Sequence, residues 1–209
     1  MRSTSLSFRP RVKPFFVGYD FLRLAAEAVT EWSTQFKDGP WGEGHTEEAE
    51  IIGLCGEHAG KQALGSNRLP DLSPLPPGGK PWDFLGPPPL NYRMEIKTST
   101  YRKAKEGLIR AVNDYGKPRP LNCEVYIFAT LLDSVRDALR YNEKVRVIIN
   151  GWVGRVEVPL RTYPPRAENG KHRNYEVPFD LLHPIPKLLE VCGIEDRWHS
   201  TIKTFYSGD

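Results

Sequence analysis

The sequence has few of the residues from which disulfide frameworks and soft-metal sites are built. Its 209 residues include three cysteines, Cys55, Cys123 and Cys192, and none of them belongs to a CxxC pair. This spacing excludes a local zinc ribbon or four-cysteine iron–sulfur site, and it predicts three buried thiols in a reducing compartment. The five histidines also lack a ligand spacing such as HxxxH, so we interpret them as structural or exposed side chains.

Long apolar runs and nucleotide-binding loops are missing as well. No stretch approaches the ~18 consecutive apolar residues that a membrane helix needs, and the basic N-terminus lacks the apolar core of a signal peptide. The sequence contains no GxxxxGK[ST] loop, no dinucleotide fingerprint and no recognisable nucleophile motif. We therefore expect a cytoplasmic protein without a membrane partner, and we expect no enzyme of these motif classes.

Charge occurs in clusters rather than in large excess. The formal net charge is +3, and 26% of the residues are charged and 39% hydrophobic, as in an ordinary globular protein. Basic residues gather in an N-terminal stretch (Arg2, Arg9, Arg11, Lys13) and in a second stretch beyond residue 100 (Arg102, Lys103, Lys105, Arg110). Such clusters are typical of nucleic-acid contacts, although the N-terminal one is equally consistent with a solvated face.

The order of the expected elements favours an α/β fold. We expect an extended basic arm over 1–18 and a single domain over 19–209. Hydrophobic periodicity and breaker residues predict a helix over 21–32 with Asp20 as its N-cap, and a second helix from His45 or Thr46 to Leu64. They also predict strands over 82–85, 93–100 and 124–132, and a short helix within 177–194. The segment over 145–160 is expected to form one long strand, or two strands joined at Asn150-Gly151. The run over 124–132 is nearly continuously apolar, as expected of a central strand buried on both faces. This order predicts a mixed central β-sheet flanked by helices.

One group of charged residues predicts a chemistry. On a strand, Glu95 and Lys97 point to one face while Ile96 points to the core. Asp83 lies twelve positions before Glu95, on a segment that a hairpin would bring beside it. Two neighbouring carboxylates repel each other, and a hard divalent cation relieves that repulsion. An all-oxygen site of this kind suits Mg²⁺ or Mn²⁺ rather than zinc.

These residues also carry a family resemblance. Asp83 followed by Glu95-Ile96-Lys97 resembles the bipartite signature of the PD-(D/E)XK nuclease superfamily, which includes type II restriction enzymes and RecB-like exonucleases. Trp82 stands where that signature has its proline. The segment GLCGEHAGKQALG is similar to the GxxGExA helix of phage and prokaryotic proteins of this type, and the likeness extends from about residue 45 onward.

The resemblance implies a restriction-endonuclease-like core and Mg²⁺-dependent hydrolysis of DNA phosphodiesters. It implies that Asp83, Glu95 and the carbonyl of Ile96 hold the cation, with Glu57 binding directly or through water. Lys97 would orient or help to deprotonate the attacking water.

The helix that carries Glu57 has two interpretations. Glu50, Gly53, Glu57 and Gly60 share a stripe opposite the apolar face, and that stripe is either solvated or packed closely on the active-site strands through its glycines. Each glycine inside a helix costs about 1 kcal/mol, which favours a packing role. Glu48 and Glu50 remain further candidates for the glutamate that completes the site.

Polar and basic residues after the Glu-x-Lys segment are the candidates for phosphate contacts: Thr98, Ser99, Arg102, Lys103 and Lys105. The sequence does not separate DNA from RNA as the substrate, because both present phosphates. It also leaves open a catalytically inactive DNA-binding or structural protein with the same fold. A dimer is possible on these data.

Overall fold

The computed structural model describes residues 13–35, 46–66, 68–73, 82–86, 88, 90–100, 106–110, 120–158 and 174–192. The secondary structure consists, in chain order, of β1 (Phe15–Val17), α1 (Tyr19–Gln35), α2 (Glu47–Ala63), β2 (Phe84–Leu85), β3 (Arg93–Thr100), β4 (Glu106–Arg110), β5 (Val125–Leu131), α3 (Val135–Tyr141), β6 (Val145–Gly154), β7 (Asn174–Pro178), the 3₁₀ helix η2 (Phe179–Leu181) and α5 (Ile185–Val191).

A five-stranded mixed sheet organises the molecule, as the sequence predicted. Its strand order is β1-β6-β5-β3-β2, and β4 pairs with β7 in a separate two-stranded sheet. The pairing of β3 with β5 is parallel, whereas β1–β6, β5–β6 and β2–β3 are antiparallel. All seven residues of β5 are buried, which confirms the central strand expected from its continuous apolar run.

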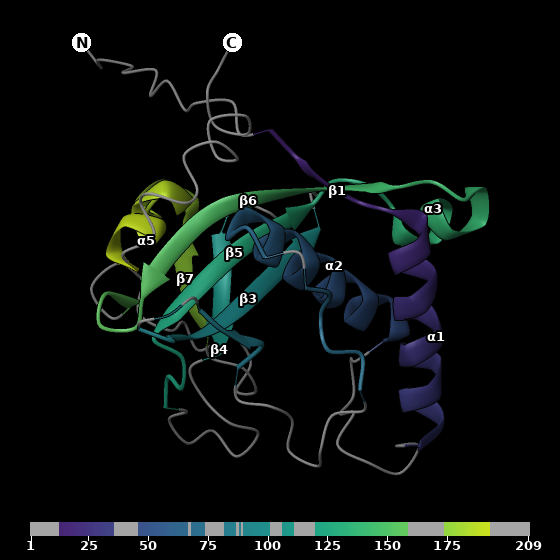
Figure 1. Ribbon diagram of the computed structural model, residues 1–209, viewed down its shortest axis with the longest axis horizontal. Helices are drawn as coiled ribbons and strands as arrows, with labels where there is room; N and C mark the ends of the chain where they lie inside the picture. The colour runs from purple at the N-terminus through teal and green to yellow at the C-terminus, as the bar shows by residue number, and fades with distance from the viewer. Residues whose placement is uncertain are drawn as a thin grey trace.

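Two hydrophobic cores lie on opposite faces of this sheet. Residues of α1, α2, α3 and α5 join Ile127 in a larger core, which we call the helix-side core. Phe128, the next residue of β5, points the other way and packs with Val177 of β7 in a second core. Figure 1 shows α2 crossing in front of the sheet, with β4 and β7 behind it.

Hydrogen bonds in the first turn mark the start of each of the two long helices, α1 and α2. Thr46 caps α2 by accepting a hydrogen bond from the Ala49 N–H at 3.2 Å, which confirms the expected start near His45 or Thr46. For α1 the prediction of Asp20 as N-cap is wrong. The helix already includes Asp20, and the carbonyl of Gly18 accepts the Leu22 N–H at 3.1 Å, so the chain turns into the helix directly after β1.

The region around Asn150-Gly151 forms one strand with an irregularity. Phe128 pairs with Gly151 and Ala129 pairs with Ile149, so Asn150 is an additional residue on β6. Gly151 has a φ of +143°, and an added Cβ would lie 2.5 Å from the carbonyl oxygen of His183. Only glycine fits this backbone and this contact, so β6 continues through the bulge as a single strand.

Several elements lie outside the sequence-based expectations. Phe15 and Val17 were expected at the end of the extended arm, but they are buried in the helix-side core as part of β1. The expected element order also omits α3, β4 and β7. No helix in the described part of the chain combines the length and apolar character that a bilayer crossing requires.

Candidate active site

The Glu-x-Lys segment lies on β3 with the alternation that the sequence predicted. Ile96 is buried against α2, whereas the side chains of Glu95 and Lys97 are 21% and 34% exposed. Glu95 and Lys97 form an ion pair on the face of the sheet away from α2. The strand therefore presents one carboxylate and one ammonium group beside the second core.

Asp83 is fixed at the edge of β3 by two hydrogen bonds. Its N–H donates to the carbonyl of Met94 at 2.9 Å, just before the short β2–β3 pairing begins at Phe84. Its carboxylate Oδ2 accepts the N–H of Ile96 at 2.6 Å. The carboxylate thus takes the place that a neighbouring strand's carbonyl would occupy. Because the N–H and C=O of one strand residue project to the same side, the Ile96 carbonyl faces this edge too.

The electrostatic environment of Asp83 differs from that of an ordinary surface carboxylate. The pKa of Asp83 is raised to about 6, mainly by burial and also by the nearby charge of Glu95, whereas the Ile96 hydrogen bond and the charge of Lys97 act to lower it. The charge of Lys61 on α2 also lowers this pKa. The charges of Glu95 and Lys97 therefore both act on the Asp83 carboxylate.

Two neighbours of the site were not anticipated. Cys123 lies 3.8 Å from Glu95 Oε2, and burial raises the pKa of its thiol to about 12. Lys61 is 9% exposed, donates to the Leu69 carbonyl at 3.2 Å and lies over the Phe84 ring. Its only signal in the sequence was its position one turn after Glu57 on α2.

Glu57 lies on the helix side of the sheet. Added Cβ atoms at Gly56 and Gly60 would collide with the side chains of Thr98 and Ile96, so these two glycines pack on β3, whereas an added Cβ at Gly53 would meet nothing within 4 Å. Glu57 is partly buried, and its helix packs on the Ile96 and Thr98 face of β3, whereas Glu95 and Lys97 lie on the opposite face.

The predicted phosphate contacts are placed only in part. Thr98 faces α2 and its hydroxyl oxygen is buried, so it does not present itself to a nucleic acid. Ser99 lies on the same face as Glu95 and Lys97 and is partly exposed. Arg102, Lys103 and Lys105 lie outside the described residues.

The donor chemistry of this edge fits a hard cation. Asp83 and Glu95 supply carboxylate oxygens and Ile96 a carbonyl, which are the ligand types that Mg²⁺ and Mn²⁺ prefer. Among the described residues, no three His, Cys, Asp or Glu side chains are grouped closely enough to hold a metal ion, so Glu57 does not join the other two carboxylates in one cluster. The fit therefore rests on two carboxylates and a backbone oxygen.

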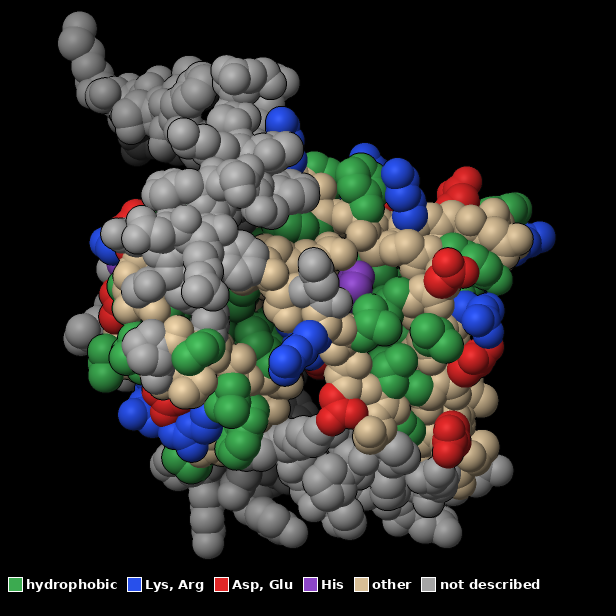
Figure 2. Space-filling view, viewed as in Figure 1, with side chains coloured by type: hydrophobic (Ala, Val, Ile, Leu, Met, Phe, Trp, Pro, Cys, Tyr) green, Lys and Arg blue, Asp and Glu red, His purple; other side chains and the backbone are tan. Residues whose placement is uncertain are grey.

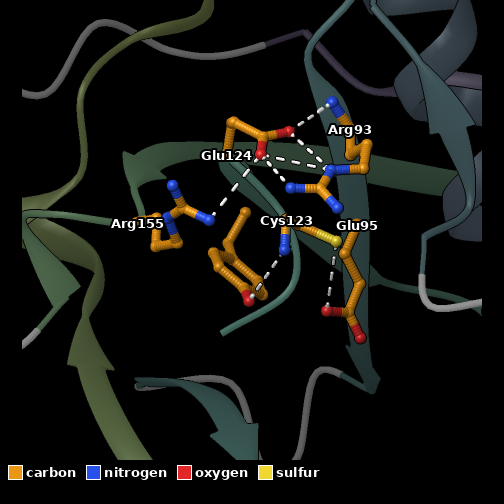
Figure 3. Close-up of polar contacts among 6 residues, drawn as sticks. Arg93, Glu95, Cys123, Glu124 and Arg155 are labelled. Atoms are coloured by element: carbon orange, nitrogen blue, oxygen red, sulfur yellow. Dashed lines mark hydrogen bonds and ion pairs between the residues drawn. The ribbon is translucent and has the colours of Figure 1, made fainter. Parts of the chain in front are cut away.

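A second charged cluster lies next to the first. Arg93 donates from Nε and Nη2 to the carboxylate of Glu124, and Nη1 of Arg155 lies 3.7 Å from the same carboxylate. Figure 3 shows the two guanidinium groups on either side of Glu124, with Cys123 between this cluster and Glu95. Arg93 also lies over the ring of Trp82, the residue before Asp83.

Comparison of the chain with protein-family models, curated proteins and solved structures gave no match.

Proposed function

We propose that this chain is a Mg²⁺-dependent nuclease that hydrolyses phosphodiester bonds of DNA, with a restriction-endonuclease-like core of the PD-(D/E)XK type. One observation carries the proposal, which is the hydrogen bond from the Ile96 N–H to Asp83 Oδ2. It holds Asp83 at the edge of β3, beside the segment that bears Glu95 and Lys97. The mixed sheet with α2 on one face is compatible with that core.

Each residue of the site has a distinct role in this proposal. Asp83, Glu95 and the Ile96 carbonyl would hold the cation, which when bound neutralises charge on the phosphate and makes a water more acidic. Lys97 would leave its ion pair with Glu95, orient the attacking water and offset the charge that develops on the phosphate. Its partly exposed side chain allows this movement.

Cleavage assays on linear, circular and single-stranded DNA test the proposal. We expect cleavage with Mg²⁺ or Mn²⁺ and none in EDTA. Lys97→Ala should reduce cleavage by roughly 10²–10⁴-fold, as loss of a general acid–base group does, and should leave DNA affinity largely intact. Lys144→Ala is the matched control, because Lys144 lies before β6 against the ring of Phe16 and outside the site.

The opposite outcome would also be informative. If the wild-type chain cuts neither DNA nor RNA with any divalent cation, and Lys97→Ala binds DNA poorly, the nuclease proposal fails. Cleavage of RNA alone would instead make the chain an RNA-directed nuclease.

The ion pair between Lys97 and Glu95 favours one alternative, a non-catalytic nucleic-acid-binding protein with this fold. The pair already neutralises one carboxylate of the site. Titration with Mn²⁺, followed by electron paramagnetic resonance, separates the two functions. The nuclease requires Mn²⁺ binding that Asp83→Asn and Glu95→Gln abolish, whereas the alternative requires none.

A further inference from the structure

Three charged residues meet at one end of the sheet. Arg93 is the first residue of β3, Glu124 directly precedes β5, and Arg155 directly follows β6. Backbone hydrogen bonds join them, because Glu124 N–H donates to the Arg93 carbonyl at 3.0 Å and Arg155 N–H donates to the Glu124 carbonyl at 2.9 Å. The two arginines are therefore held at fixed positions by the strand ends.

The cluster carries more positive charge than its carboxylate can balance. The Glu124 carboxylate accepts hydrogen bonds from Nε and Nη2 of Arg93, and from the Arg93 backbone N–H at 2.8 Å. Both carboxylate oxygens are therefore hydrogen-bonded to Arg93. Arg155 at 3.7 Å is an ion-pair neighbour without a hydrogen bond to that carboxylate. Two guanidinium groups against one carboxylate leave one positive charge. The side chains of Arg93 and Arg155 are 38% and 44% exposed, so this charge is accessible.

The position of the cluster relative to the candidate active site suggests its ligand. Arg93 and Glu95 lie on one face of β3, two residues or about 6.5 Å apart along the strand. That distance is close to two nucleotide rises of about 3.4 Å in a DNA strand. By contrast, the α2 face in Figure 2 shows acidic and basic side chains interspersed, without a patch of one sign among the described residues.

We infer that Arg93 and Arg155 form a phosphate-binding subsite for a DNA strand, one or two nucleotides from the phosphate at Asp83 and Glu95. This deepens the proposed function and rests on it for the position of the substrate. Guanidinium groups suit this task because their N–H donors match phosphate oxygens in pairs. Glu124 orients Arg93, and the phosphate binds to the positive charge of the two guanidinium groups that Glu124 does not balance.

The ion pair offers a test with two variants that break the same contact. Arg93→Gln removes the cation of the pair and Glu124→Gln removes the anion. If the cluster is purely structural, both variants should weaken DNA binding. If it is a phosphate-binding subsite, the DNA affinities of the two variants should differ. We measure binding of a short fluorescent DNA duplex by anisotropy in EDTA, over a series of salt concentrations, so that no cleavage is required.

We expect Arg93→Gln and Arg155→Gln each to weaken binding roughly tenfold. Each should also lower the slope of log K against log salt by about 0.9, the value for one lost phosphate contact on duplex DNA. Glu124→Gln should bind more tightly than the wild type, because it removes a negative charge beside both guanidinium groups while its amide oxygen can still accept a hydrogen bond from Arg93. Arg155→Gln keeps the Arg93–Glu124 pair and its own backbone hydrogen bond, so it reports on the subsite even if Arg93→Gln fails to fold.

The inference is overturned if Glu124→Gln weakens binding as much as Arg93→Gln, or if Arg155→Gln leaves the salt slope of the wild type unchanged. Failure of the nuclease proposal is distinguishable from either result. A chain that never cleaves but shows the divergent binding retains the subsite, whereas a chain that cleaves with an unchanged salt slope loses only the subsite.

Discussion

At the scale of single residues, Asp83 carries a cost that the fold must offset. Its carboxylate lies beside Glu95 in a partly buried position, and its one short hydrogen bond comes from the Ile96 backbone. Burial disfavours the charged form of a carboxylate. The fold is therefore less stable when Asp83 is ionised than when it is protonated, in the absence of a cation.

This cost predicts a pH-dependent effect of Asp83→Asn. The pKa of Asp83 is raised from 3.8 to about 6, so its favourable contribution is fully present below pH 3.8 and is lost as pH rises through about 6. In EDTA at pH 8, Asp83→Asn should therefore be more stable than the wild type by roughly 2–3 kcal/mol. The difference should vanish below pH 4. Urea unfolding across this pH range measures it.

Asp133 provides the control of opposite sign. A hydrogen bond from Arg146 lowers the pKa of Asp133, so the ionised form is the stabilising one. Asp133→Asn should lower stability at pH 8. If both variants shift stability in the same direction at pH 8, burial of Asp83 is not the cause.

At the scale of elements, the contact between α2 and β3 depends on particular glycines. An added Cβ at Gly56 would lie 1.8 Å from Thr98 Oγ1 and 2.9 Å from Thr98 Cβ, whereas nothing lies within 4 Å of such an atom at Gly53. At Gly60 the nearest atom is the flexible Cδ1 end of Ile96. Substitution by alanine should therefore affect stability differently at each of these three glycines.

Alanine at these glycines should give a graded series. Gly56→Ala should destabilise the fold by about 1–3 kcal/mol because it overpacks the contact with Thr98. Gly53→Ala should stabilise it by about 1 kcal/mol, since only helix propensity changes there. Gly60→Ala should lie between them. Thermal unfolding of the three variants measures the order, and equal effects at Gly53 and Gly56 would contradict the close approach of α2 to β3.

Elements with long, regular patterns were predictable from the sequence. The runs that form α2, β3 and β5 contain enough periodic or apolar residues to determine their type. Short elements were not predictable from the sequence. The strand β1, for example, has only three residues, and it is stabilised by pairing with β6. The helix α3 did leave a signal, since Ser134 accepts the Asp137 N–H at 3.2 Å in a Ser-x-x-Asp sequence typical of a helix start.

The candidate site was predictable where its residues are close in sequence. Asp83 and Glu95 are joined by one hairpin, so alternation and spacing place them together. Lys61 and Cys123 reach the site from α2 and from the segment before β5, and sequence spacing carries no information on such distant contacts. For Glu57, a helical wheel shows the stripe but not which face of the sheet the helix covers.

At the scale of the whole molecule, β5 joins the two cores. Ile127 belongs to the helix-side core and Phe128 to the second core, and both side chains are almost fully buried. Loss of packing on either face therefore acts on the same central strand. The domain should unfold as one cooperative unit.

Phe128→Ala tests this cooperativity. We expect it to lower the free energy of unfolding by about 3–5 kcal/mol, as truncation of a buried aromatic side chain does. Far-ultraviolet dichroism, which reports α1 and α2 on the other side of the sheet, should still change in the same transition as tryptophan fluorescence. Val156→Ala is the control, because Val156 is 78% exposed and its truncation should change stability by less than about 0.5 kcal/mol. Separate transitions for the two signals would show independent cores.

The order of the strands along the chain also has a consequence during synthesis. Glu57, Asp83, Glu95 and Lys97 all precede β5 and β6, although β5 is the partner that buries β3. At about 5–20 residues per second, the ribosome needs roughly 3–11 s to add the residues between Lys97 and the end of β6 at Gly154. For that interval the nascent chain carries every candidate catalytic group without the sheet that supports them. The proposed active site can therefore form only after the strand that ends at Gly154 has left the ribosome, so an unfinished chain would lack the proposed nuclease activity.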